Sequence, residues 1–100
     1  MEQNRLYAST AFRAVSPKDD CGLGHTCDTL AELVEMISDS EARAQEQGFP
    51  AREWLVVTIR VNTIFKDDRF SYSSTIEAIG IYGKDGKLRH LDGTDWGRID

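Results

Sequence analysis

The sequence predicts a single α+β domain of two layers, in which one amphipathic helix covers one face of an antiparallel sheet in the order β-α-β-β-β. Segments with an apolar residue at every second position flank one segment whose apolar residues recur at helical spacing. Short polar turns join the later strands, which makes neighbouring strands antiparallel. The chain has 100 residues, the size of one domain, so we expect one core for residues 1–100.

The first strand is predicted over residues 5–15, where the side chains alternate between two faces. Residues 16–24 follow with the Pro, Gly and Asp content of a loop. The even-numbered positions of the strand carry its more apolar face, which consists of Leu6, Ala8, Thr10, Phe12 and Ala14.

The helix is predicted to begin after Thr29, because Thr29-Leu-Ala-Glu32 matches a capping box. An apolar stripe at helical spacing follows, made of Leu30, Leu33, Val34 and Ile37. Gly48 suits the left-handed conformation that ends helices, and Pro50 prevents the helix from resuming. A second capping pattern, Ser38-Asp-Ser-Glu41, leaves two alternatives open: one continuous helix, or a helix kinked or split near residues 38–40.

The strongest strand pattern covers residues 54–65, and we expect this strand at the centre of the sheet. We expect the helix to cover the face formed by Leu55, Val57, Ile59 and Val61. Residues 66–68 are predicted to form a hairpin turn. In the next strand the alternation of apolar side chains shifts by one residue near residues 78–80, which indicates a β-bulge or a bend. Gly83-Lys-Asp-Gly86 predicts a tight turn before a short strand over residues 87–91. Residues 92–100 form a polar C-terminal tail, which Trp96 is expected to anchor.

The charge and the apolar runs exclude several classes of function. Seventeen acids against twelve bases give a net charge of −5, which argues against direct binding to nucleic acid. The longest apolar run is Trp54-Leu-Val-Val57, far short of the roughly 20 residues that a membrane span needs. The N-terminal residues lack the apolar segment of a signal peptide, so we expect a cytoplasmic protein.

Five acids of the predicted helix form a row on one side, opposite the apolar stripe. At about 100° per residue they lie within about 60° of one another, with axial steps of roughly 4.5–6 Å over most of the row. Arg43 is the only base of the helix, so few local ion pairs neutralise them. We call this surface the acidic row: Asp28, Glu32, Glu35, Asp39 and Glu46.

The acidic row has two interpretations, a plain solvated surface or a surface that binds a partner. A surface of mixed charge would serve solubility better than a row of one sign. We therefore predict that the row presents a phosphate-like pattern to a basic protein surface.

The soft ligands of the chain suggest an alternative function. Cys21, His25 and Cys27 lie in one short loop, and His90 could complete a four-ligand zinc site. Cys-x3-His-x-Cys is not a familiar zinc-knuckle spacing, and two reduced thiols or a redox-labile pair fit the loop as well. Cys27 also precedes the helix N-terminus, which favours a lowered thiol pKa, although a structural thiol is the preferred interpretation.

The sequence has no P-loop, dinucleotide fingerprint, serine elbow or zinc-protease helix, so we expect no catalysis and no cofactor. In its small size, acidity and strand-and-turn content, rather than by any motif, the chain resembles small phage and mobile-element proteins, including anti-CRISPR inhibitors. We predict a non-catalytic protein-binding module, an inhibitor or adaptor that docks on a basic, nucleic-acid-binding protein surface. The alternative is a small metal-binding or thiol-dependent protein that uses the loop between Cys21 and Cys27.

Overall fold

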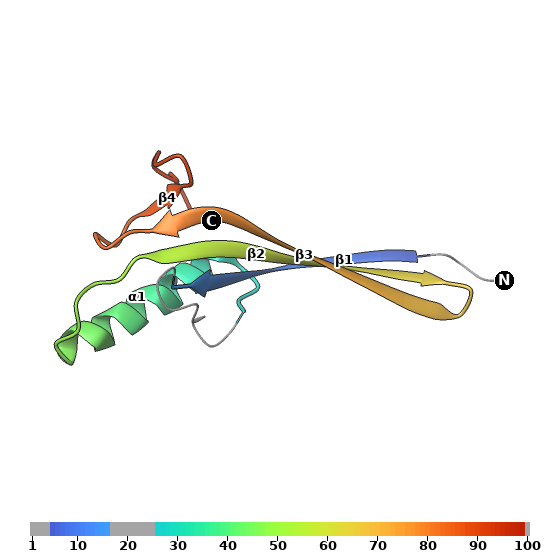
Figure 1. The fold of residues 1–100 in the computed structure, drawn as a ribbon, viewed down its shortest axis with the longest axis horizontal. Coiled ribbons are helices and arrows are strands. Elements are labelled where there is room, and N and C mark those ends of the chain that lie inside the picture. The colour runs from blue at the N-terminus through green and yellow to red at the C-terminus, as the bar shows by residue number, and fades with distance from the viewer. Residues whose placement is uncertain (1–4, 17–25, 100) are drawn as a thin grey trace.

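The computed structural model describes residues 5–16 and 26–99, and it confirms the predicted α+β fold. The strands pair in the order β1-β2-β3-β4, every neighbouring pair is antiparallel, and a single helix packs on this sheet (Figure 1). The elements are β1 (Arg5–Val15), α1 (Leu30–Glu46), β2 (Trp54–Lys66), β3 (Arg69–Tyr82) and β4 (Leu88–His90).

The ends of α1 follow the local signals of the sequence. The Thr29 hydroxyl accepts a hydrogen bond from the Glu32 backbone N–H at 3.1 Å, which caps the first turn. At the other end Gly48 has a φ of +84°. The N–H groups of Gly48 and Phe49 donate to the carbonyls of Gln45 and Ala44, the two bonds of a Schellman motif. The helix runs unbroken through residues 38–40, so the continuous alternative is correct.

The turns and the bulge of the sheet also match the prediction. Asp67 and Asp68 form the two-residue turn between β2 and β3 with φ values of +52° and +61°, as a type I′ turn requires. Val56 pairs with Gly80 and Val57 with Ala78, so Ile79 is the extra residue of a β-bulge. This bulge explains why the apolar residues of β3 switch from even-numbered to odd-numbered positions after Ala78.

The prediction of which β2 face the helix covers is wrong. Leu33 and Ile37 of α1 are fully buried in one cluster with Ala14 and Val56, which pair across β1 and β2. Because side chains alternate along a strand, Leu55, Val57, Ile59 and Val61 lie on the opposite face. The longer apolar alternation therefore marks the face that α1 leaves open.

The C-terminal tail folds back onto this core. The Trp96 N–H donates to the Leu88 carbonyl at 3.1 Å, and the Trp96 ring stacks on His90 with 4.3 Å between ring centroids. Trp96 also packs against the core cluster. Trp96 therefore anchors the tail, as the sequence predicts.

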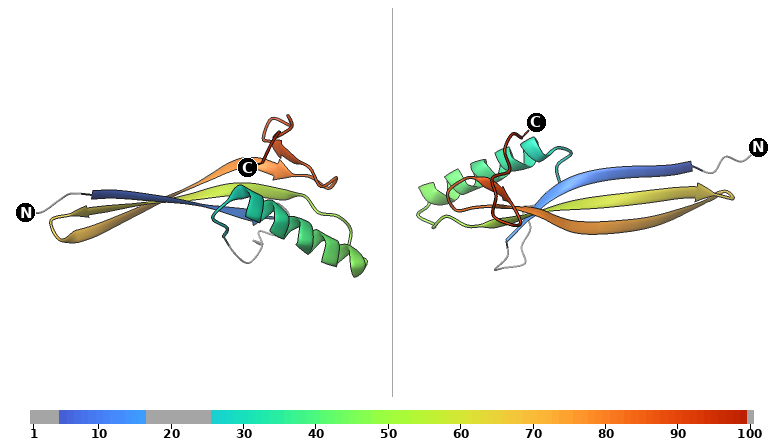
Figure 2. Two further views of the ribbon diagram at one scale, coloured as in Figure 1. Left: turned by 180° about the vertical axis from the view of Figure 1, so that it is seen from behind. Right: turned by 90° about the horizontal axis from the view of Figure 1, so that it is seen from above.

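The sheet is much longer than the helix that packs on it. At about 3.3 Å per residue the 14 residues of β3 span roughly 46 Å, whereas the 17 residues of α1 span roughly 25 Å at about 1.5 Å each. The molecule is elongated, with extents of 60 × 27 × 22 Å, and its three longest strands continue well beyond the helix (Figure 2). We call this outer part of the sheet the arm: residues 7–11, 59–65 and 70–76.

Candidate functional site

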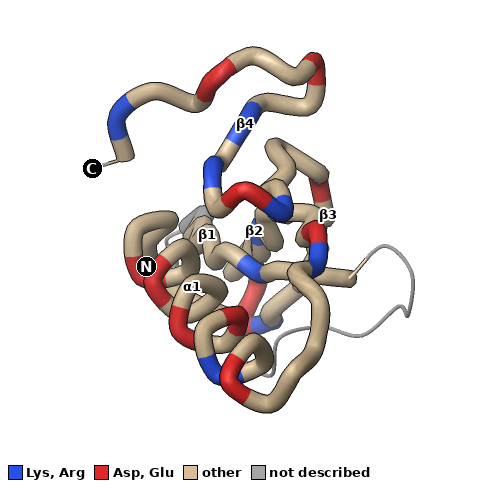
Figure 3. Tube along the Cα trace, turned by 90° about the vertical axis from the view of Figure 1, so that its left-hand side faces the viewer, with Lys and Arg blue, Asp and Glu red and all other residues tan. Residues whose placement is uncertain are grey.

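All five residues of the acidic row are exposed; Glu32, Glu35, Asp39 and Glu46 lie on α1, whereas Asp28 precedes the N-cap residue Thr29 and lies outside the helix. Figure 3 marks the acids of the helix in red along its length. Within the described part of the chain the ion pairs are Arg52–Glu41 and Arg89–Asp85, and neither involves the row. The row therefore presents carboxylates that no described basic side chain pairs with.

A sixth acid of α1, Glu41, lies on the packed side of the helix and belongs to a different cluster. Its Oε1 atom accepts a hydrogen bond from Trp54 Nε1 at 2.6 Å and lies 3.4 Å from Arg52 Nε. The Arg52 guanidinium lies over the Trp54 ring, 4.7 Å from its centroid. This cluster was not predicted from the sequence, although Glu41 follows Ile37 by four residues and so shares its side of the helix.

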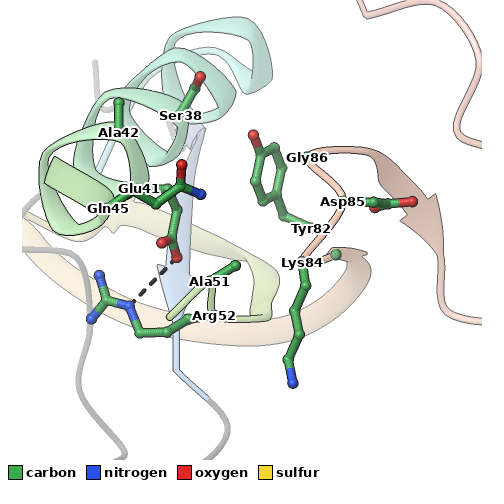
Figure 4. Close-up of a pocket in the computed structure, with 11 residues that line it drawn as sticks. Ser38, Glu41, Ala42, Gln45, Ala51, Arg52, Tyr82, Lys84, Asp85 and Gly86 are labelled. Carbon is green, nitrogen blue, oxygen red and sulfur yellow. Dashed lines mark ion pairs between the residues drawn. The ribbon is translucent and has the colours of Figure 1, made fainter. Parts of the chain in front are cut away.

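This cluster borders a hollow of about 240 Å³ between α1 and the turn after β3 (Figure 4). Tyr82 projects from the end of β3 toward the helix, and Lys84 and Asp85 come from the turn. Glu41 Oε2 is shielded from solvent and has no hydrogen-bond partner among the described residues. Glu41 contacts Trp54 and Arg52, so we assign the Glu41 cluster a structural role, joining α1 to the start of β2.

The environment of Cys27 contradicts the prediction of a lowered thiol pKa. Burial raises the pKa of the Cys27 thiol above its ordinary value, and the nearby Glu32 and Asp28 carboxylates raise this pKa further. Burial and these two acids, rather than the helix N-terminus, therefore determine the direction in which the Cys27 pKa moves. The backbone of Cys27 pairs with Phe12 through two hydrogen bonds of 2.8 Å, which holds the residue at the open edge of β1.

The metal alternative stays a prediction. Cys21 and His25 lie outside the described residues. Cys27 lies beyond the edge strand β1, whereas His90 belongs to β4 at the other edge of the sheet. Residues 5–16 and 26–99 contain no group of three or more potential metal ligands.

We expect Cys27 to react slowly with iodoacetamide near neutral pH, because a raised pKa keeps the thiol protonated. In a Cys21→Ser chain, the midpoint of the rate against pH should lie above the roughly 8.5 of an ordinary cysteine. Adding Asp28→Asn and Glu32→Gln should move the midpoint down, since both carboxylates raise the pKa. A midpoint near pH 7 in the Cys21→Ser chain would instead indicate an activated thiolate.

The two faces of the arm differ in chemistry. On the face that continues from the α1 side, the surface is polar, with a shallow hollow lined by Thr10, Thr58, Arg60, Asn62, Thr75 and Glu77. The other face carries apolar and aromatic side chains, and Phe65, Phe70 and Tyr72 contact one another on it, with ring centroids 4.8 and 6.4 Å apart. The arm therefore offers a second surface of very different character from the acidic row.

No family model matches the chain, and no match is found among the curated proteins or the solved structures. The functional argument therefore depends on the surfaces described above. Among the described residues, no helix has the length and apolar content needed to cross a membrane.

Proposed function

We propose that this chain is a non-catalytic protein-binding module that docks through the acidic row on a basic protein surface. The observation that carries the proposal is the arrangement of four exposed carboxylates on one side of a single, capped helix, with the exposed Asp28 just before its N-cap and no basic partners among the described residues. A rigid helix fixes the spacing of the carboxylates before binding, which lowers the entropy cost of docking.

The charge pattern supports one kind of partner in particular. From Glu32 to Asp39 the carboxylates follow one another along the helix at steps of roughly 4.5–6 Å, which offers a closely spaced series of negative charges. A groove that binds nucleic acid is lined with Lys and Arg side chains that pair with phosphates. We therefore propose that the partner is a nucleic-acid-binding protein and that the chain acts as its inhibitor or adaptor, as small phage and mobile-element proteins do.

The environment of Cys27 supports a non-catalytic role. A thiol whose pKa is raised by burial and by two neighbouring acids is a poor nucleophile at neutral pH. Glu41 is engaged with Trp54 and Arg52, so its Oε1 atom is not free to act as a general base.

Salt dependence of capture tests the electrostatic part of the proposal. The purified chain, immobilised through a terminal tag, should retain a basic nucleic-acid-binding protein from lysate at about 0.05 M salt and lose most of it at about 0.5 M, because salt screens exposed charges. Excess DNA or RNA should compete with the chain for the captured protein. Equal recovery at both salt concentrations, with no competition by nucleic acid, would contradict docking through the acidic row.

A further inference from the structure

The uncharged face of the arm is a continuous surface that no other described element covers. Residues that pair across antiparallel strands share a face, so the register identifies its members. We call this surface the arm face: Tyr7, Ser9, Ala11, Ile59, Val61, Thr63, Phe65, Phe70, Tyr72, Ser74 and Ile76. Four large side chains on it are strongly exposed, at 49% for Tyr7, 59% for Phe70, 71% for Tyr72 and 68% for Ile76.

Helix α1 cannot cover the arm face, because it packs on the other face of the sheet and at its other end (Figures 1 and 2). A three-stranded sheet gains stability in water when one of its faces is packed. Folded monomers rarely leave a contiguous apolar patch larger than a few hundred Å² in water. We therefore expect a binding partner to cover the arm face in the folded protein.

We propose that this occupant is a second copy of the chain, and that two arm faces pack together as the two sheets of a sandwich. The inference is independent of docking through the acidic row. Every residue of the arm face is uncharged, and the bases that share its register, Arg5 and Arg13, lie at its two ends, so two copies can pack there without like charges at the centre of the interface, despite the net charge of −5. With a two-fold axis perpendicular to this face, the same surface of each copy would contact that of the other.

The geometry of the sheet permits two arm faces to pack in this way. Sheets in a sandwich lie about 10 Å apart with their strands within about 30° of each other. In such a dimer each α1 stays on the outer face of its own sheet, so neither the helix nor the acidic row is buried. The dimer would thus present two acidic rows to partners.

Three aromatic side chains of the arm face supply nearly half of the area that each partner of a stable dimer buries. At about 200 Å² per fully buried aromatic side chain, the exposed parts of Tyr7, Phe70 and Tyr72 supply roughly 350 Å². Ile76 and the half-buried side chains of β2 extend this area toward the roughly 800 Å² per partner of a standard interface. A transient partner would leave this surface bare between encounters, whereas a second copy is present wherever the chain is made.

Sedimentation velocity of the full chain tests the proposal directly. We expect twice the chain mass of 11.3 kDa at micromolar concentration. The arm offers a matched pair of isoleucines on its two faces: Ile76 on the arm face and Ile64, 44% exposed, on the polar face. Ile76→Glu should weaken the dimer at least tenfold, because two carboxylates would be buried in the interface, whereas Ile64→Glu should leave its affinity unchanged.

Circular dichroism and Trp fluorescence of both variants report whether α1 and the core around Trp54 still fold. A monomeric wild-type chain at 100-fold higher concentration would overturn the proposal. Equal dissociation of the Ile64→Glu and Ile76→Glu dimers would also overturn it, as would an Ile76→Glu variant that stays dimeric.

Discussion

Replacing Val56 by Asp is expected to prevent the chain from folding. Val56 is fully buried between β1, β3 and α1, in one cluster with Leu33 and Ile37. An unpaired carboxylate at this position costs several kcal/mol, which is comparable with the whole stability of about 5–15 kcal/mol of an ordinary domain. The far-ultraviolet circular dichroism of the variant should lose its helical signal, and thermal unfolding should show no cooperative transition.

Ile64→Asp is the matched control for this substitution. Ile64 belongs to the same strand and to the same face as Val56, but it lies in the arm and is 44% exposed. The carboxylate of the introduced Asp would remain in water, so the Ile64→Asp variant should fold. A Val56→Asp chain that unfolds as cooperatively as Ile64→Asp would show that the core has been placed on the wrong face of β2.

Replacing Glu41 by Ala is expected to lower the free energy of unfolding by about 1–3 kcal/mol. The change removes the acceptor of the Trp54 Nε1–H group, which is buried and would then have no partner. It also removes the carboxylate beside Arg52. Glu41→Gln keeps an acceptor oxygen, so it should cost less in urea denaturation than Glu41→Ala.

A double-mutant cycle separates this hydrogen bond from loss of packing. Trp54→Phe removes the donor, so Glu41→Ala should cost about 1 kcal/mol less in that background than in the wild type. Additive effects of the two changes would mean that the Trp54–Glu41 contact contributes nothing to stability.

Local signals were sufficient to predict the elements of the fold. The Thr29 cap, the left-handed Gly48 and the hairpin turn each depend on a few neighbouring residues; the first two occur as predicted, and the turn predicted over residues 66–68 occurs at Asp67 and Asp68, with Lys66 still in β2. The bulge at Ile79 was predictable because an extra residue reverses the alternation of all residues after it.

The contacts between elements were not predictable in the same way. Alternation identifies which side chains of β2 share a face, but not which face the helix covers. The face with the longer apolar run, from Leu55 to Val61, is the one that α1 leaves open. Glu41 was missed for a related reason, because its role depends on the Trp54 indole 13 residues away. The acidic row could be identified from the sequence alone because exposure of a helix surface follows from its period.

Neutralising the acidic row is the most direct test of the proposed function. The triple variant Glu32→Gln, Glu35→Gln, Asp39→Asn removes three charges from the row, whereas Glu53→Gln, Asp67→Asn, Asp68→Asn removes three exposed charges elsewhere. Asparagine tolerates the positive φ of the hairpin turn, so the control should fold. Both chains have the same net charge, and their affinities for the protein captured by the wild type can be measured by calorimetry. Docking through the row predicts at least a tenfold loss of affinity for the row variant and little change for the control; equal affinities for the two variants would contradict it.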